Sequence, residues 1–495
     1  MITRNLQLFR KIETILLSIM LYGIFLVYIF QYFQIAGKYQ PWTTDEFFYY
    51  IEAKGIASQN IYQTPASLDG NTSYIGNFGF HGISYAIKDG WLSKLFFHTN
   101  DPPMVWINVL TCFVLLLLIL LFKPLELNTR LKIALVVATH YILYTFTFSY
   151  MQETIQFLFG VLALRILYLI YSKSADPNSI NVKIIYYLII VVIAIAFRFS
   201  WFIWGLGLLP LTTNLKSFIK WSLIAIGLLL LGLFFNHYIS APYPYDGVIM
   251  EKLIGSEKSS LINSLHSIWG NFTNNLELFL TPTILLVTSM RYLFLILLLL
   301  NTSFAIIKRN KFAMACSLIA WAYFIACLCF SFAFWGYDER ALAVISPLLA
   351  FSLIGTVNSF IFYPIIILQL YFLPSTIEQT NIRNNTAIAV NTTTPERTSR
   401  EASYSQIKDL ITDEENIVVE LPIRFVVHAA PTYFINLPLV TAKGYPIHYR
   451  IYREGKDKTG ARIPHYLLNT NDPFPIPDNN QLIYSNKWMS LYRLF

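Results

Sequence analysis

The chain has 495 residues, of which 55% are hydrophobic and only 13% are charged, and its net charge is +8. Soluble globular proteins carry about 25% charged residues, so this composition excludes a chain that folds mainly in water. The positive charge does not indicate nucleic-acid binding, because the basic residues lie mostly in short segments between apolar runs, where they orient membrane proteins. All four cysteines lie inside apolar runs, which predicts no disulfide framework.

A helix needs about 20 apolar residues to cross a hydrocarbon core of roughly 30 Å. Windows of that length predict an all-α polytopic membrane protein with about eleven transmembrane helices. We expect these spans near residues 12–36, 104–122, 131–149, 153–171, 182–197, 200–215, 218–237, 285–307, 312–333, 341–357 and 359–374. The first run is too long for a cleaved signal peptide and lacks a small-residue cleavage site, so we expect it to remain as a span.

Lysine and arginine side chains predict the orientation of these spans. They precede the first span and recur after the second, fourth, sixth and eighth spans. Because basic loops stay in the cytoplasm, the N-terminus is predicted to be cytoplasmic, and the odd number of spans places the C-terminus outside. The outer side would then carry a first loop over 38–103, a second loop near 238–284, and tight corners at 149–153, 198–199 and 334–341.

The chain changes character near residue 375. The sequence predicts a transmembrane domain over 1–374, a polar, Asn- and Thr-rich linker over 375–403, and a soluble extracytoplasmic domain over 404–495. The pattern of the last domain indicates a small α/β or α+β fold. Its predicted elements are a helix over 404–411 and strands over 416–421, 425–427, 482–484 and the last nine residues.

The first outer loop opens on an acidic pair. Thr43 and Glu46 form a T-x-x-E capping box, so a helix should begin there with Asp45 in its first turn. Its side chains divide into two faces, with Phe47, Phe48 and Ile51 on one and Glu52, Lys54 and Ser58 on the other. Such a helix is expected to lie flat in the membrane interface. Because the helix dipole favours acidic residues at this end, capping is the simpler role for Glu46, while catalysis and structure both stay open for Asp45.

Further ionisable residues collect at the same predicted depth. Glu153 opens the fourth span, Arg198 lies in the turn before the sixth, and Arg291 lies near the outer end of the eighth. Arg340 opens the tenth span. Ionisable residues near a bilayer are usually functional, and arginines bind phosphate through paired hydrogen bonds. Arginines also anchor span ends to headgroups, so the clustering, rather than any one residue, indicates a site.

Four other residues are candidates for substrate contacts. A lone histidine is usually a satisfied structural group, but His81 lies in the first outer loop and is the best exception. Tyr49 and Tyr337 offer aromatic rings near the outer face, where tyrosine is common in any case and where it can also stack on a sugar. Glu339, next to Arg340, offers a carboxylate for a hydroxyl or an ammonium group.

The segment DEFFYYIEAKGIASQNIY resembles the first-loop signature of GT-C glycosyltransferases, the superfamily of aminoarabinose transferases and protein O-mannosyltransferases. The segment NFGFHGISYAIKDGWLSKLFF resembles the stretch that follows, although the usual His-Pro-Pro is His81-Gly82-Ile83 here. MQETIQFLFGVLAL, FRFSWFIWGLGLLPL and DERALAVISPLLA resemble the acidic and Arg-led beginnings of later spans. The resemblance covers residues 10–350, and the tail matches the family only in its location.

The resemblance implies an inverting transfer of a sugar from a polyprenyl-phosphate carrier to an extracytoplasmic glycan, glycolipid or protein. Asp45, paired with Glu46, would act as general base, and Glu153 would be the second carboxylate. The three arginines at the outer face would neutralise the departing phosphate. Some relatives use a divalent metal ion, which the acidic residues could ligate, although no spacing here requires one.

Other classes of function stay open. A transporter or flippase would place ionisable groups near the bilayer midplane, where this sequence has few, and a polymerase of lipid-linked glycans would be expected to centre on a large late loop. A non-catalytic scaffold would tolerate Asp45→Asn without loss. Abundant Ile, Asn, Tyr and Lys are typical of an AT-rich genome, and we expect a bacterial inner (plasma) membrane protein.

Overall fold

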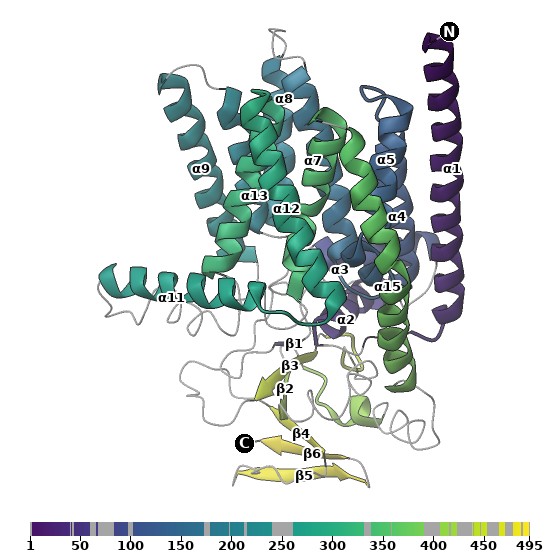
Figure 1. Cartoon of the computed structure of the whole chain (residues 1–495). Coiled ribbons are helices and arrows are strands. Elements are labelled where there is room, and N and C mark those ends of the chain that lie inside the picture. The colour runs from purple at the N-terminus through teal and green to yellow at the C-terminus, as the bar shows by residue number, and fades with distance from the viewer. Residues whose placement is uncertain are drawn as a thin grey trace.

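The computed structural model describes most of the helical part of the chain and pieces of its C-terminal part. The described residues are 2–39, 41, 44–59, 66–67, 84–97, 102–172, 179–197, 199–211, 215–239, 261–330, 338–357, 359–390, 406–414, 417–422, 438, 440–445, 447–452, 465–470, 479–486 and 489–494. Helices dominate these residues, and they form a bundle with a small sheet beyond one end (Figure 1).

Each predicted span coincides with helical structure. The bundle consists of α1 (Ile2–Ile35), α4 (Met104–Leu120), α5 (Leu127–Ala138), α6 (Tyr141–Thr147), α7 (Glu153–Ser172), α8 (Ser179–Ala196), η2 (Phe199–Leu211), α9 (Leu215–Ile239), α12 (Leu285–Ile307), α13 (Lys311–Phe330), η3 (Asp338–Val344), α14 (Ser346–Ser352), η4 (Leu353–Val357), η5 (Ser359–Ile361) and α15 (Phe362–Val390). Within the described residues, five helices are long and apolar enough to cross a membrane, and the count of eleven stays a prediction.

The third predicted span is divided into α5 and α6. The break lies at His140, whose Nδ1 accepts a hydrogen bond from the backbone N–H of Ile142 at 3.3 Å and so caps α6. Tyr28 of α1 packs on this break and donates from its hydroxyl to the Ala138 carbonyl at 2.9 Å, which satisfies an orphan carbonyl at the end of α5. A hydropathy window predicts one span here, because the residues of α5, of the break and of α6 are all compatible with a buried environment.

The two ends of the bundle differ. The N-terminus of α1 lies at one end, whereas α2 (Thr44–Gln59), α11 (Leu261–Leu280) and the sheet lie at the other (Figure 1). The first outer loop and the C-terminal domain therefore share one end of the molecule. Which side of the membrane this end faces stays a prediction from the basic residues.

Helix α2 begins at Thr44, one residue after the predicted cap, but its side chains do not divide into a buried face and an exposed face. Ile51 and Glu52, expected on opposite faces, are both buried, with exposed fractions of 1% and 4%. The cause is α3 (Ser84–Leu92), which packs so closely on α2 that a Cβ at Gly90 would lie 2.7 Å from Ile56 Cβ. The division into two faces that predicted an interfacial helix is therefore not found, and the orientation of α2 relative to the membrane stays a prediction.

Helix α11 lies in a segment that the sequence analysis interprets as a loop. It runs across the end of the bundle instead of along it (Figure 1). Leu265 and Trp269 are exposed on it, while Asn275 is buried and donates from Nδ2 to the Leu328 carbonyl of α13 at 2.8 Å. Polar residues interrupt the apolar ones in this helix, so a window tuned to a full span does not detect it.

Helix α15 continues to Val390, so the predicted linker does not begin at residue 375. A buried face explains the difference, because its small and polar members recur with helical spacing and pack on the bundle. These residues are Thr376, Thr380, Asn384 and Ala387. Thr380 donates to Thr145 of α6 at 3.3 Å, a contact that a composition typical of linkers conceals. Residues 391–403 of the predicted linker lie outside the described residues.

The sheet has the strand order β1-β3-β2-β4-β6-β5. Its strands are β1 (Ala66–Ser67), β2 (Ile417–Pro422), β3 (Ile447–Tyr452), β4 (Tyr466–Thr470), β5 (Asn480–Ser485) and β6 (Met489–Leu494). Three predicted strands and the helix, found over 406–410, are confirmed, whereas 425–427 lies outside the described residues. Strand β1 comes from the first loop and pairs in parallel with β3, so that loop is tied to the C-terminal domain.

Candidate active site

Glu46, in the first turn of α2, is fully buried and bonded from three directions. Its Oε1 accepts hydrogen bonds from the Tyr39 hydroxyl at 2.7 Å, from the backbone N–H of Tyr150 at 3.2 Å, and from Arg383 Nη2 at 2.7 Å. A buried carboxylate is tolerated only when it is paired and hydrogen-bonded in this way. Glu46 therefore does more than cap α2: it joins four parts of the chain.

Arg383 is the residue of this site that the sequence analysis misses. It lies on α15 beyond the predicted last span, and 14% of its side chain is exposed. Its guanidinium also stacks over the Phe146 ring of α6, 4.8 Å from the ring centroid. One signal in the sequence could have located Arg383. The helical spacing of Thr376, Thr380 and Asn384 predicts that the polar segment around Arg383 is a packed helix.

A second acidic and basic pair lies beside the first. Arg340, from η3, places Nε 4.0 Å from Oε1 of Glu153, the first residue of α7. Glu153 is 1% exposed and sits at a helix N-terminus, where the helix dipole stabilises a carboxylate. Arg340 is more open, with 21% of its side chain exposed. Arg383 interacts electrostatically with both members of this pair as well as with Glu46, so the four charges form one group.

The corner between α6 and α7, residues 148–152, holds the two pairs together. Tyr150 donates its N–H to Glu46, and Met151 accepts a weak hydrogen bond at Sδ from Arg340 Nη1 at 3.6 Å. Asn108 of α4 fixes the corner by donating from Nδ2 to the Met151 carbonyl at 3.0 Å. We call Glu46, Glu153, Arg340 and Arg383, with this corner, the charge cluster.

Some of the predicted site residues fall in or near the charge cluster. Tyr49 joins it, because its hydroxyl accepts a 2.6 Å hydrogen bond from Gln152 Nε2. Asp45 precedes Glu46 in α2 and Glu339 precedes Arg340 in η3, but their side chains are outside the described part of the structure. His81, Arg198 and Tyr337 lie entirely outside the described residues, although Arg198 directly precedes η2.

Arg291 has a different setting. It lies on α12, is 1% exposed, and donates from Nη1 to the carbonyls of Leu278, Phe279 and Thr281 at 3.1, 3.4 and 3.4 Å. These carbonyls belong to the last turn of α11 and to the residue that follows it, where a helix needs hydrogen-bond donors from outside. The described contacts thus show Arg291 capping a helix, and its predicted contact with a phosphate stays a prediction.

We expect Arg291→Met to lower the free energy of unfolding by about 1.5–3 kcal/mol, the usual effect of losing hydrogen bonds to a charged group. Thermal unfolding in lipid nanodiscs measures this loss. Tyr292→Phe is the matched control, because the Tyr292 hydroxyl donates to the neighbouring Leu280 carbonyl at an exposed position. A fall in donor affinity without a change in stability would instead support the phosphate contact.

The described residues contain no group of three or more His, Cys, Asp and Glu side chains that could hold a metal ion. Both carboxylates of the charge cluster face a guanidinium, which reduces their attraction for a cation. The donor set of the described side chains does not fit a divalent metal, and we derive no step through one.

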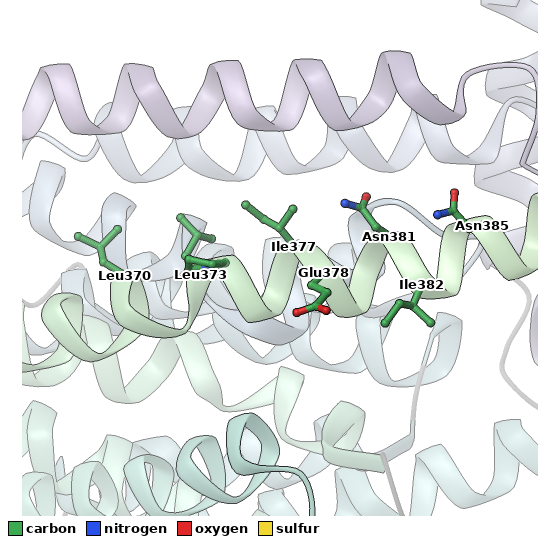
Figure 2. Close-up of a pocket in the computed structure, with 8 residues that line it drawn as sticks. Leu370, Leu373, Ile377, Glu378, Asn381, Ile382 and Asn385 are labelled. Carbon is green, nitrogen blue, oxygen red and sulfur yellow. The ribbon is translucent and has the colours of Figure 1, made fainter.

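A groove lies between α1 and α15 (Figure 2). Its larger part has a volume of about 530 Å³, and its lining side chains on α15 are Leu370, Leu373, Pro374, Ile377, Glu378, Asn381, Ile382 and Asn385. The described residues that line it include no basic side chain to meet a phosphate. Asn381 and Asn385 are each two positions from Arg383, and residues so spaced point to opposite sides of a helix. None of the described residues that line the groove belongs to the charge cluster.

No protein-family model matches the sequence, and no curated protein matches it. Among solved structures, it is similar to the oligosaccharyltransferase of Archaeoglobus fulgidus in complex with zinc and sulfate, with 12% identity and a TM-score of 0.48 over 86% of this chain and 62% of that one. It is also similar to ArnT from Cupriavidus metallidurans bound to undecaprenyl phosphate, with 10% identity and a TM-score of 0.48 over 95% and 97%. These neighbours are GT-C glycosyltransferases.

A third structure is AglB of Archaeoglobus fulgidus in complex with an inhibitory peptide and a dolichol-phosphate. It shares 11% identity with this chain at a TM-score of 0.46, over 86% of this chain and 64% of that one. The chain thus spans less than two thirds of the length of the archaeal enzyme, whereas its length is close to that of ArnT.

Proposed function

We propose that this chain is an integral membrane glycosyltransferase that moves a sugar from a polyprenyl-phosphate carrier to an extracytoplasmic acceptor. The observation that carries the proposal is the charge cluster. Two carboxylates and two guanidinium groups gather where α2 meets α7, η3 and α15, and α2 lies at the end of the bundle that carries the sheet (Figure 1). A reaction between a lipid phosphate and a polar acceptor needs both kinds of group at that depth.

The proposed chemistry is a single inverting displacement. Asp45 takes the proton of the acceptor nucleophile, whose freed electron pair forms the new bond to the anomeric carbon. The bond from that carbon to the phosphate oxygen breaks, and polyprenyl phosphate leaves with the electron pair. Arg340, together with Arg198, stabilises the negative charge that develops on the phosphate, and Glu153 orients the acceptor.

The placement of Arg340 supports its part in this scheme. Its 4.0 Å separation from Glu153 is longer than a direct hydrogen bond, and its side chain is more open than that of Arg383. A guanidinium can bind two oxygens of a phosphate at once through paired hydrogen bonds. Tyr49, His81, Tyr337 and Glu339 are proposed as substrate contacts around this centre.

The function is tested by incubating the purified chain in nanodiscs with a panel of sugars linked to undecaprenyl or dolichyl phosphate. We expect release of polyprenyl phosphate with at least one donor, together with transfer of the sugar to an added acceptor or to water. Mass spectrometry follows both products. Movement of an intact donor across a sealed vesicle, with no cleavage of any donor in the panel, would show a transporter instead and would contradict the proposal.

A further inference from the structure

The extension of α15, residues 375–390, reaches the charge cluster through its one basic residue, Arg383. The Arg383 guanidinium has two described partners, the Glu46 carboxylate at 2.7 Å and the Phe146 ring at 4.8 Å. The proposed displacement uses Arg340 for the phosphate and Asp45 for the proton. It therefore leaves the pair of Arg383 and Glu46 without a part in the reaction.

The geometry at Glu46 shows what this pair controls. Three hydrogen bonds meet at the single atom Oε1, and they come from the end of α1, from the corner between α6 and α7, and from α15. Contacts from three separate elements fix the position of that oxygen, and Glu46 lies in the first turn of α2. Asp45 is the adjacent residue in the same turn, so its backbone is held by the same contacts.

A direct contact between Arg383 and a donor phosphate fits the structure less well. The guanidinium is stacked on one face by Phe146 and engaged at Nη2 by Glu46, and turning its paired donors fully onto a phosphate would draw it away from both partners. Leaving would place Glu46, which is fully buried, without its counter-ion, a costly state. Arg383 is thus arranged to act through Glu46.

We infer that Arg383 is a positioning residue for sugar transfer: by holding Glu46 it fixes the first turn of α2, and with it Asp45, against the corner that leads to Glu153. This inference rests on the proposed function. It makes the extension of the last helix a component of the active site. A misplacement of about 1 Å at a reacting group can lower a rate about 10²-fold, so loss of this pair should act on kcat.

The test compares Arg383→Met with the double variant Arg383→Met/Glu46→Gln. The single variant leaves a buried carboxylate without its counter-ion and is expected to lower Tm, whereas the double variant removes both charges and should recover most of that loss. Both variants are assayed for kcat and donor KM. We expect kcat to stay about 10–100-fold below wild type in the double variant, with donor KM within about threefold of wild type.

A second buried ion pair provides the matched control. Lys132 Nζ lies 2.7 Å from Glu13 Oε1, and both side chains are largely buried. Glu13 precedes Ile35 by 22 residues, which is about 33 Å along α1, so this pair lies far from the charge cluster. Lys132→Met/Glu13→Gln should therefore leave kcat at the wild-type value.

The outcomes separate the alternatives. A double variant that recovers both Tm and kcat would show that the pair only stabilises the fold, and would overturn the inference. A rise in donor KM matching that of Arg340→Met would show a direct phosphate contact, and would also overturn it. If the double variant does not fold, Arg383→Gln decides, because its neutral amide removes the ion pair with Glu46: unchanged kcat overturns the inference, and reduced kcat with donor KM near the wild-type value supports it. A wild-type chain inactive with every donor refutes the proposed function and the inference together.

Discussion

Asp45→Asn is expected to lower kcat by about 10²–10⁴-fold, the range that general-base catalysis contributes. The substitution keeps the size of the side chain and removes only its ability to accept the acceptor proton. Donor affinity should change little, because the phosphate is assigned to arginines. Single-turnover kinetics with a saturating donor would measure the chemical step, and binding of a non-transferable polyprenyl phosphate would report affinity separately.

The matched control is Glu52→Gln, which neutralises another acidic residue of α2 two turns away. Glu52 is buried, so the variant tests whether any loss of a carboxylate from this helix disturbs it. A retained kcat in Asp45→Asn would remove Asp45 from the mechanism. The base would then be sought at Glu153, the other carboxylate of the cluster that lies at a helix N-terminus.

The structure describes the side chain of Glu46, the neighbour of Asp45. Glu46 is fully buried, and one of its oxygens already accepts from Tyr39, Tyr150 and Arg383. The sequence predicts that Glu46 caps a helix. The structure shows a wider role, because Glu46 joins the end of α1, α2 and α15 to the corner between α6 and α7.

The apolar helices could be predicted because hydrophobic length is a local property of the sequence. The pairing of Glu153 with Arg340 was also within reach, since both begin predicted spans on one side of the membrane, and the structure places them 4.0 Å apart. Strands β2, β5 and β6 could be predicted for the same reason, because side-chain periodicity is also a local property of the sequence. In each case a short stretch of sequence contains the whole signal.

The errors concern residues whose environment is set by distant parts of the chain. Glu52 looks solvent-facing until α3 packs on α2, and the close approach at Gly90 depends on residues about 35 positions away. Arg383 looks like part of a polar linker because its partner Glu46 lies 337 positions earlier. Tertiary contacts override local composition at such sites. A search for helical spacing of small and polar residues beyond the last span would have found the extension of α15.

Arg340→Met is expected to lower kcat/KM for the lipid-phosphate donor by about 10²–10³-fold. This is the usual effect of removing one group that stabilises charge in the transition state. Arg340→Lys should fall between Arg340→Met and the wild type, since an ammonium keeps the charge but loses the paired geometry of a guanidinium. Affinity for polyprenyl phosphate, the proposed leaving group, should fall in the same order. Steady-state kinetics and binding in nanodiscs measure both effects.

Arg165→Met is the control for this series. Arg165 lies on α7, twelve residues after Glu153, and stacks on the Phe122 ring, 5.1 Å from its centroid. The substitution should change stability without changing the kinetics. Equal losses of kcat/KM in Arg165→Met and Arg340→Met would mean that the reaction of the donor phosphate does not depend specifically on the charge cluster. If Arg340→Met instead lowers the rate of transfer to the acceptor and leaves the affinity for the donor unchanged, the role of Arg340 is to hold Glu153 in place.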